Sequence, residues 1–407
     1  MSTQEKKWIE AFRLGVVPKN LPPSLQILYD NVFTQISRDL KELSDDGGIV
    51  RWICGPYGSG KTLLSKQIQQ FAKRNGFVTS SFSLSDGLKL HHLDHWYYGT
   101  LHHLSAQINM QEVKSFHELF NQWIQSLRSQ DNVEDSTKLI KEMLENLNFH
   151  HHSFSHALNQ YIRARLQKDI ALATACASWL SGEREVPQHI KEKLEVKGSV
   201  SKENSLEFFQ GFMTLIKWLS FRGMVLIIDE AELLLRARSD LRQRAYENIR
   251  QMIDWVYDGT LPNLSIIWLT TPELLENQEK GISTYDALAQ RIQLLDWQKR
   301  ENIHSSSCIL SLHQIGEKEI DTLANEIVSI YCTGYSFSCP VQPKSIGNWA
   351  LLHLKQDGVV HPFLTVRRFV QQMIKILDII RENPTQRYYQ TELERSAYNG
   401  THLFTNK

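Results

Sequence analysis

Short, mostly apolar runs alternate with longer stretches of helical period along the chain. Runs of this kind occupy residues 49–54, 224–228 and 265–269, and polar residues end the second and the third run. Strands that are buried on both faces of a parallel sheet have this continuous apolar character. Strands that alternate with helices in this way predict an α/β fold with a doubly wound parallel sheet.

The helical stretches suggest how the chain is divided. We predict N-terminal helices in residues 1–48, a sheet-containing core in 49–305 and a mainly helical small domain in 306–382, before a polar tail in 383–407. The distance between the first two apolar runs is too long for a minimal core. A large helical insertion is therefore expected at about residues 95–205.

The stretch GPYGSGKT at residues 55–62 follows the first apolar run and precedes a helical stretch. Its pattern is that of a phosphate-binding loop, with Gly55, Gly60, Lys61 and Thr62 in the fixed positions. The glycines let backbone N–H groups turn toward phosphate oxygens, and the next helix presents its positive end to them. The alternative is a chance glycine-rich turn. The predicted nucleotide contacts in this stretch are Gly55, Pro56, Tyr57, Gly58, Ser59, Gly60, Lys61, Thr62 and Leu63.

Two acids, Asp229 and Glu230, follow the second apolar run directly. An acid at the tip of a buried strand can hold Mg²⁺ together with the Thr62 hydroxyl, and a second acid can orient or deprotonate water. The alternative is the ordinary preference for acids at a helix start. Together with the phosphate loop, the pair favours ATP hydrolysis with Mg²⁺ as cofactor, and Lys61 and Glu230 are the expected catalytic residues.

Three further residues are candidates for contacts with phosphate. Thr270 and Thr271 follow the third apolar run, whose tip should lie beside the Asp229 tip in a sheet of this type. A Thr271 hydroxyl there could bond the γ-phosphate or the attacking water, although a β-branched strand end is the alternative. Arg291 ends a short helical stretch and could reach the γ-phosphate of a neighbouring subunit. Arg367 or Arg368 lies at a predicted helix start, where a cation is unfavourable for the helix dipole.

Arginines are concentrated just after the acidic pair, in the stretch LRARSDLRQRAYENIR. Helical spacing would place several of them on one face, where they could contact the phosphate backbone of DNA. The alternative is a solvated helix in which Asp240 and Glu247 pair with them. The candidate DNA contacts are Arg236, Arg238, Arg242 and Arg244.

Composition limits the possible compartments of the chain but identifies no partner. Lysines plus arginines equal aspartates plus glutamates at 45 each, so no global field draws the chain to nucleic acid or to a membrane. No apolar run approaches the length of a membrane span, and the first residues lack the apolar core of a signal peptide. The five scattered cysteines form no metal motif, and a reducing cytoplasm is the expected compartment.

Several stretches in this order resemble one family: GPYGSGKT, FRGMVLIIDEAELL, RAYENIRQMID, LTTPEL and YDALAQRI. The chain resembles the P-loop ATP-binding proteins of the BREX bacteriophage-defence systems over about residues 5–382. That family is in turn similar to AAA+ ATPases of the Orc/Cdc6 initiator and loader type. This resemblance implies an AAA+ fold, with Thr271 at the sensor-1 position, Arg291 as arginine finger and Arg367 at sensor 2. It also implies that residues near Val16 to Lys19, among them Val17, pack on adenine.

The resemblance implies partners as well: a superfamily 2 (Lhr-like) helicase or other defence proteins, duplex DNA, and further copies of the chain with ATP sites between subunits. The resulting hypothesis is an ATP-driven switch in antiphage defence that assembles on DNA and loads or activates a helicase. The alternative is a signalling ATPase that docks protein partners without binding DNA. A small-molecule kinase fits poorly, because paired acids activate water better than an acceptor substrate.

Overall fold

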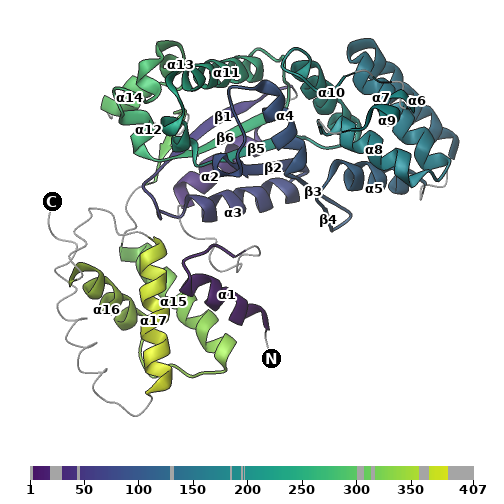
Figure 1. Ribbon diagram of the computed structural model, residues 1–407. Helices are drawn as coiled ribbons and strands as arrows, with labels where there is room; N and C mark the ends of the chain where they lie inside the picture. Colours follow the sequence, from purple (N-terminus) through teal and green to yellow (C-terminus); the bar gives the residue numbers. More distant parts are fainter. Residues whose placement is uncertain are drawn as a thin grey trace. The chain divides into compact units, whose positions relative to one another are not determined.

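A computed structural model describes residues 3–18, 30–43, 46–128, 133–183, 186–193, 196, 198–299, 307–312, 317–356 and 366–383. The described residues form two compact units (Figure 1). The sheet unit takes its residues from Gln35–Cys54 and Ile68–Leu310, and the helical unit from Met1–Thr34, Gly55–Gln67 and Ser311–Lys407. The predicted boundary at residue 305 and residues 384–407 of the predicted tail lie outside the described residues.

Seven strands form the sheet, in the order β4-β3-β2-β5-β6-β1-β7. They are β1 (Ile49–Cys54), β2 (Phe77–Ser83), β3 (Leu104–Ile108), β4 (Gln111–Val113), β5 (Gly223–Asp229), β6 (Leu264–Thr270) and β7 (Ile309–Ser311). Strands β2, β5, β6 and β1 pair in parallel, whereas β3 pairs antiparallel with β2 and with β4. The predicted α/β class is confirmed, and the sheet, predicted to be parallel, is mainly parallel.

Strand register determines which residues share the carboxyl edge of the sheet. Ser83 of β2 is opposite Asp229 of β5, and Cys54 of β1 is opposite Thr270 of β6. Because β5 and β6 are also parallel neighbours, the carboxyl ends of all four strands lie at one edge. Trp52 and Trp268 stack at 4.8 Å between ring centroids, and both are buried in the core of the sheet unit. The prediction that the end of the 265–269 strand lies beside Asp229 is confirmed.

Helices make up most of the remaining described structure. In the sheet unit they are α2 (Asp30–Lys41), α4 (Leu93–His102), α5 (Phe116–Arg128), α6 (Val133–His150), α7 (His152–Leu166), α8 (Ile170–Leu180), α9 (Gln188–Lys193), α10 (Ser205–Trp218), α11 (Ser239–Tyr257), α12 (Pro272–Glu276), α13 (Asp286–Arg291), α14 (Leu294–Lys299) and the 3₁₀ helices η2 (Leu84–Asp86), η3 (Ala231–Arg236) and η4 (Ile282–Thr284), with α2 beginning in the helical unit. Helix α3 (Lys61–Arg74) runs from one unit into the other, and α1 (Thr3–Arg13), α15 (Glu317–Tyr335), α16 (Pro343–Gln356) and α17 (Val366–Glu382) belong to the helical unit. None of the helices within the described residues is long and apolar enough to cross a membrane.

The segment between β2 and β5 is mainly helical, but it also contains a hairpin that helical periodicity does not predict. Strands β3 and β4 are joined at Asn109 and Met110, whose φ angles are 48° and 67°. Two successive residues at positive φ characterise the tight turns that join twisted antiparallel strands. The hairpin extends the sheet beyond β2 to its edge strand β4.

Helix α1 packs with helices that come some 300 residues later in the chain. Figure 1 shows it beside α15 and α17. Ile9 and Phe12 are buried in one apolar cluster with residues of α15, α16 and α17. The buried positions of α1 recur at helical spacing, which is the pattern of an amphipathic helix packed on a core. The first helix of the chain is therefore part of the helical unit.

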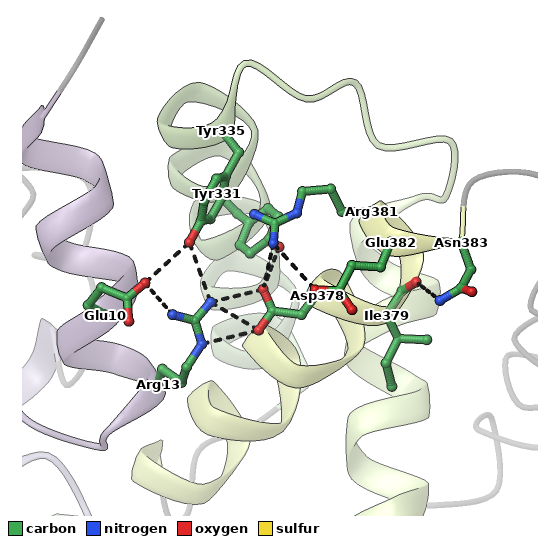
Figure 2. A network of polar contacts seen from close by, with 9 residues as sticks. All are labelled: Glu10, Arg13, Tyr331, Tyr335, Asp378, Ile379, Arg381, Glu382 and Asn383. Carbon is green, nitrogen blue, oxygen red and sulfur yellow. Dashed lines mark hydrogen bonds and ion pairs between the residues drawn. The ribbon is translucent and has the colours of Figure 1, made fainter.

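A polar network fastens α1 to its neighbours (Figure 2). The Asp378 carboxylate accepts hydrogen bonds from Arg13 Nε at 3.1 Å and Nη2 at 2.9 Å, and from the Tyr331 hydroxyl at 2.6 Å. Arg13 also pairs with Glu10, and Arg381 lies over the Tyr335 ring with 3.9 Å to its centroid. Asp378 thus joins a cation on α1 to a phenol on α15.

Replacing Asp378 by alanine should lower the stability of the helical unit by about 1–3 kcal/mol, because Arg13 and Tyr331 lose a charged acceptor that is mostly shielded from water. Calorimetric melting of the full chain measures this loss. Asp321→Ala is the matched control: its contact with Lys344 is exposed, and such pairs contribute about 0–1 kcal/mol. Equal losses in the two variants would contradict the assigned role of Asp378.

Candidate functional site

The predicted phosphate loop joins the carboxyl end of β1 to the first residue of α3. Gly58 and Gly60 have φ angles of 75° and 95°, which L side chains rarely adopt. A Cβ atom on Gly55 would stand 2.8 Å from Ser59 Oγ and 3.0 Å from Leu312 Cβ. Glycine is therefore needed at these three positions for the loop to curl, as the sequence predicts.

The start of α3 has the electrostatic character that an anion requires. The helix is 14 residues long, and its first turn contains no acidic residue. Lys61 is only 8% exposed, and its ammonium donates to the carbonyls of Gly55 at 2.6 Å and Pro56 at 3.0 Å. Thr62 is exposed on the same turn, while Leu63 is buried in the core of the helical unit. Lys61 thus closes the loop upon itself and keeps a cation at its centre.

Two further contacts tie the helical unit together around the loop. The Lys66 ammonium on α3 donates to the carbonyls of Val17 at 3.1 Å and Pro18 at 2.8 Å. The backbone N–H of Arg367, near the start of α17, donates to the Gly58 carbonyl at 3.3 Å. The structure therefore places the Val17 carbonyl against α3 and the backbone of Arg367 against the loop. Residue 19, which belongs to the predicted adenine-packing segment, lies outside the described residues.

The carboxyl edge of the sheet holds the two predicted acids. Asp229 ends β5, and its carboxylate accepts the backbone N–H of Glu230 at 2.8 Å. Glu230 has a φ angle of 57°, and such left-handed strain in a residue with a side chain occurs often at functional sites. Its carboxylate accepts the Ser83 hydroxyl at 2.5 Å. Sequence reasoning missed Ser83, because only strand pairing brings it opposite Asp229.

Thr271 follows β6 at the same edge and is 3% exposed. Its backbone N–H donates to Glu232 at 3.2 Å, and its hydroxyl makes no hydrogen bond within the described part of the chain. The buried Glu232 was also missed by sequence reasoning, although it stands in the same acidic run, DEAE. A buried donor at this edge suits a ligand with anionic oxygens.

These residues fit the ATP and Mg²⁺ that the sequence predicts. The curled loop and the start of α3 provide N–H groups and a cation for phosphates, which is how P-loops bind them. Mg²⁺ is ordinarily held by one or two protein oxygens together with substrate phosphates, and the Thr62 hydroxyl and the Asp229 carboxylate are oxygens of this kind.

The predicted arginines have different environments. Arg291 lies at the end of α13 and forms an ion pair with Asp254 of α11 at 2.6 Å. Arg236 and Arg238, just before α11, and Arg244, in its second turn, are exposed. Arg242, in contrast, is 8% exposed and donates to the Ala237 carbonyl at 2.7 Å. Its side chain therefore takes part in the fold, and the exposed members of the predicted stripe number three.

Comparison with known proteins identifies the family. No curated protein matches the chain. A family model described as "BREX system ATP-binding protein BrxC/D" matches residues 2–394, which is nearly the whole chain. The resemblance noted in the sequence is thereby confirmed, and it agrees with the loop and the acidic edge described above. The chain belongs to the BrxC/D family of BREX system ATP-binding proteins.

Proposed function

We propose that this protein is an AAA+ switch that hydrolyses ATP, works in the cytoplasm and assembles into homo-oligomers with ATP sites between subunits. It assembles on duplex DNA and loads or activates a superfamily 2 (Lhr-like) helicase of the defence system. One observation carries the proposal: β1, which the phosphate loop follows in the chain, and β5, which ends in the Asp-Glu pair, have their carboxyl ends at the same edge of a parallel sheet.

Each residue has a defined role in the proposed hydrolysis. Lys61 and the N–H groups at the start of α3 bind the phosphates, and Thr62 and Asp229 hold Mg²⁺, which neutralises charge on the phosphate oxygens. Glu230 takes a proton from the attacking water, and Thr271 donates its hydroxyl to the γ-phosphate or to that water. Arg367 and Val17 contact the nucleotide from the helical unit.

The exposed arginines support a nucleic-acid partner. Arg238 is the N-cap residue of α11, where a cation opposes the helix dipole at a cost of about 0.3–1 kcal/mol. Arg236 ends η3, and Arg244 lies in the second turn of α11. An exposed pair such as Arg238 with Asp240, at 3.4 Å, offsets little of this cost. Phosphates of a DNA backbone would neutralise all three cations.

Steady-state ATP hydrolysis with and without duplex DNA tests the proposed function, with Lys61→Ala as the blank. DNA should stimulate turnover, and retention on DNA should weaken with salt. Changing the three exposed arginines to alanine should remove the stimulation and reduce the salt slope by roughly 0.9 per lost phosphate contact. The matched control removes three exposed lysines of the helical unit: Lys6, Lys7 and Lys375.

If turnover were indifferent to DNA, the DNA part of the proposal would fail. Stimulation would then be sought from the helicase or from other defence proteins, as expected for a signalling ATPase that docks protein partners. Turnover of the wild type above the Lys61→Ala blank distinguishes this outcome from a protein that has no ATPase activity at all.

Ser83→Ala is expected to raise turnover without a partner about 3- to 10-fold, with ATP affinity unchanged. The Ser83 hydroxyl occupies an oxygen of the Glu230 carboxylate and holds it toward β2, so this hydrogen bond must be released before that oxygen can take a proton from water. Ser83→Thr keeps the hydroxyl donor and should behave as wild type. Ser81→Ala is the control, because it changes a neighbouring serine of β2. A fall in turnover in Ser83→Ala would instead mean that Ser83 orients the base for reaction.

A further inference from the structure

Two arginines share one carboxylate where α11 and α13 meet. The Asp254 carboxylate accepts Arg291 Nε at 2.6 Å and Arg291 Nη2 at 3.2 Å, and its Oδ2 also accepts Arg250 Nη1 at 2.5 Å. Arg291 Nη1 donates to the Ala287 carbonyl at 3.0 Å. The orientation of the Arg291 guanidinium is thus fixed by three of its nitrogen atoms.

The cluster of Arg250, Asp254 and Arg291 can bind a further anion. A guanidinium has five N–H donors, and the contacts of Arg291 within the described residues use three of them. The cluster has two positive charges and one negative charge. Exposed fractions are 35% for Arg291, 33% for Asp254 and 26% for Arg250, so solvent reaches all three side chains.

A purely structural ion pair would not need this arrangement. Helix α13 is already fixed to the core by Leu288, which is fully buried, and Ile292 is buried directly after it. The Tyr246 hydroxyl of α11 also donates to the Lys280 carbonyl, in the loop before α13, at 2.7 Å. Partly exposed ion pairs add only about 0–1 kcal/mol to stability. The cluster, with its net positive charge, therefore contributes little to the packing of α13 against α11.

We propose that Asp254 is a positioning residue that presents Arg291 and Arg250 together to the phosphates of a nucleotide held by a second copy of the chain. Guanidinium groups with fixed orientation bind phosphate oxygens in a bidentate manner and stabilise charge that develops during phosphoryl transfer. Arg250 adds a second cation beside the predicted arginine finger. The inference rests on the proposed function, since it requires ATP sites that are shared between subunits.

Asp254→Ala is expected to lower ATP turnover of the assembled protein at least tenfold, with KM changed less than twofold. Turnover falls because both guanidinium groups lose their orientation, whereas the subunit's own phosphate loop stays intact. Arg250→Ala should lose about fivefold, and Arg291→Ala should lose at least as much as Asp254→Ala. Glu247→Ala removes the same charge from an exposed position on α11 and should behave as wild type.

A mixed-subunit experiment separates positioning from misfolding. Asp254→Ala subunits are mixed with Lys61→Ala subunits, which cannot use their own ATP site but have an intact arginine pair. Turnover of the mixture should exceed the sum of the two proteins measured separately, because the second protein supplies the arginines that the first presents poorly. Misfolded Asp254→Ala subunits would show no such gain.

The inference is overturned if Asp254→Ala keeps or exceeds wild-type turnover while Arg291→Ala loses it. It is also overturned if mixing rescues Arg291→Ala but not Asp254→Ala. If both Arg291→Ala and Asp254→Ala hydrolyse ATP as wild type does, the shared site of the proposed function fails together with the inference.

Discussion

Lys61→Ala is expected to weaken ATP binding roughly 100-fold or more and to bring hydrolysis below detection. Two interactions are lost in this variant, one with the nucleotide and one within the loop. The cation that would pair with the β- and γ-phosphates is removed, and truncating one member of such a buried, hydrogen-bonded charge pair costs about 2–5 kcal/mol. The carbonyls of Gly55 and Pro56 also lose the ammonium that closes the loop. Calorimetric titration with ATP and Mg²⁺ measures the affinity directly.

Lys73→Ala provides the matched control, because Lys73 lies in the last turn of the same helix and pairs with Glu112 of β4. It removes the same charge and should leave ATP affinity within twofold of wild type. Lys61→Arg keeps the charge but replaces a compact ammonium by a planar guanidinium, so it should recover only part of the affinity. Full ATP affinity in Lys61→Ala would show that the loop is not the phosphate site.

The parts of the fold that the sequence predicts are those with a strong local signal. Strand β5 is an apolar run that ends in two acids, and the loop before α3 combines glycines, Lys61 and Thr62 in a fixed pattern. Parallel strands are buried on both faces, so their sequences carry this signal without knowledge of any partner. The position of Thr271 beside the acidic edge followed from the same logic, because adjacent parallel strands end at the same side.

The parts that the sequence does not predict depend on contacts between distant residues, or on the direction in which a side chain points around its helix. Arg13 and Asp378 are 365 positions apart, and no local pattern relates them. Ser83 meets Glu230 only because β2 pairs with β5. Helical spacing across residues 235–250 placed Arg242 with the other arginines, but η3 ends at Arg236 and α11 begins only at Ser239. Within α11, a rotation of about 100° per residue decides which side chain is buried, and Arg242 faces inward.

The second large effect is expected from substitutions in the acidic pair, Asp229 and Glu230. Glu230 is the only acid proposed to exchange a proton during the reaction, whereas Asp229 holds a metal ion and Glu232 holds the backbone of Thr271. Replacing each acid by its amide should therefore have a different consequence. Asp229→Asn should lower the affinity for Mg²⁺, and Glu232→Gln should lower stability, because it weakens a buried hydrogen bond.

Glu230→Gln is expected to reduce hydrolysis about 10²- to 10⁴-fold while ATP binding stays within a few-fold of wild type. Glutamine has the same shape and can still accept the Ser83 hydroxyl, but it cannot take a proton from water. The variant should therefore accumulate in the ATP-bound, assembled form, which sedimentation with ATP and Mg²⁺ would show as a species larger than the monomer. If the variant bound ATP and stayed monomeric, ATP sites shared between subunits would be excluded. Hydrolysis at the wild-type rate would instead remove Glu230 from the mechanism and leave the strained backbone at this position without a catalytic role.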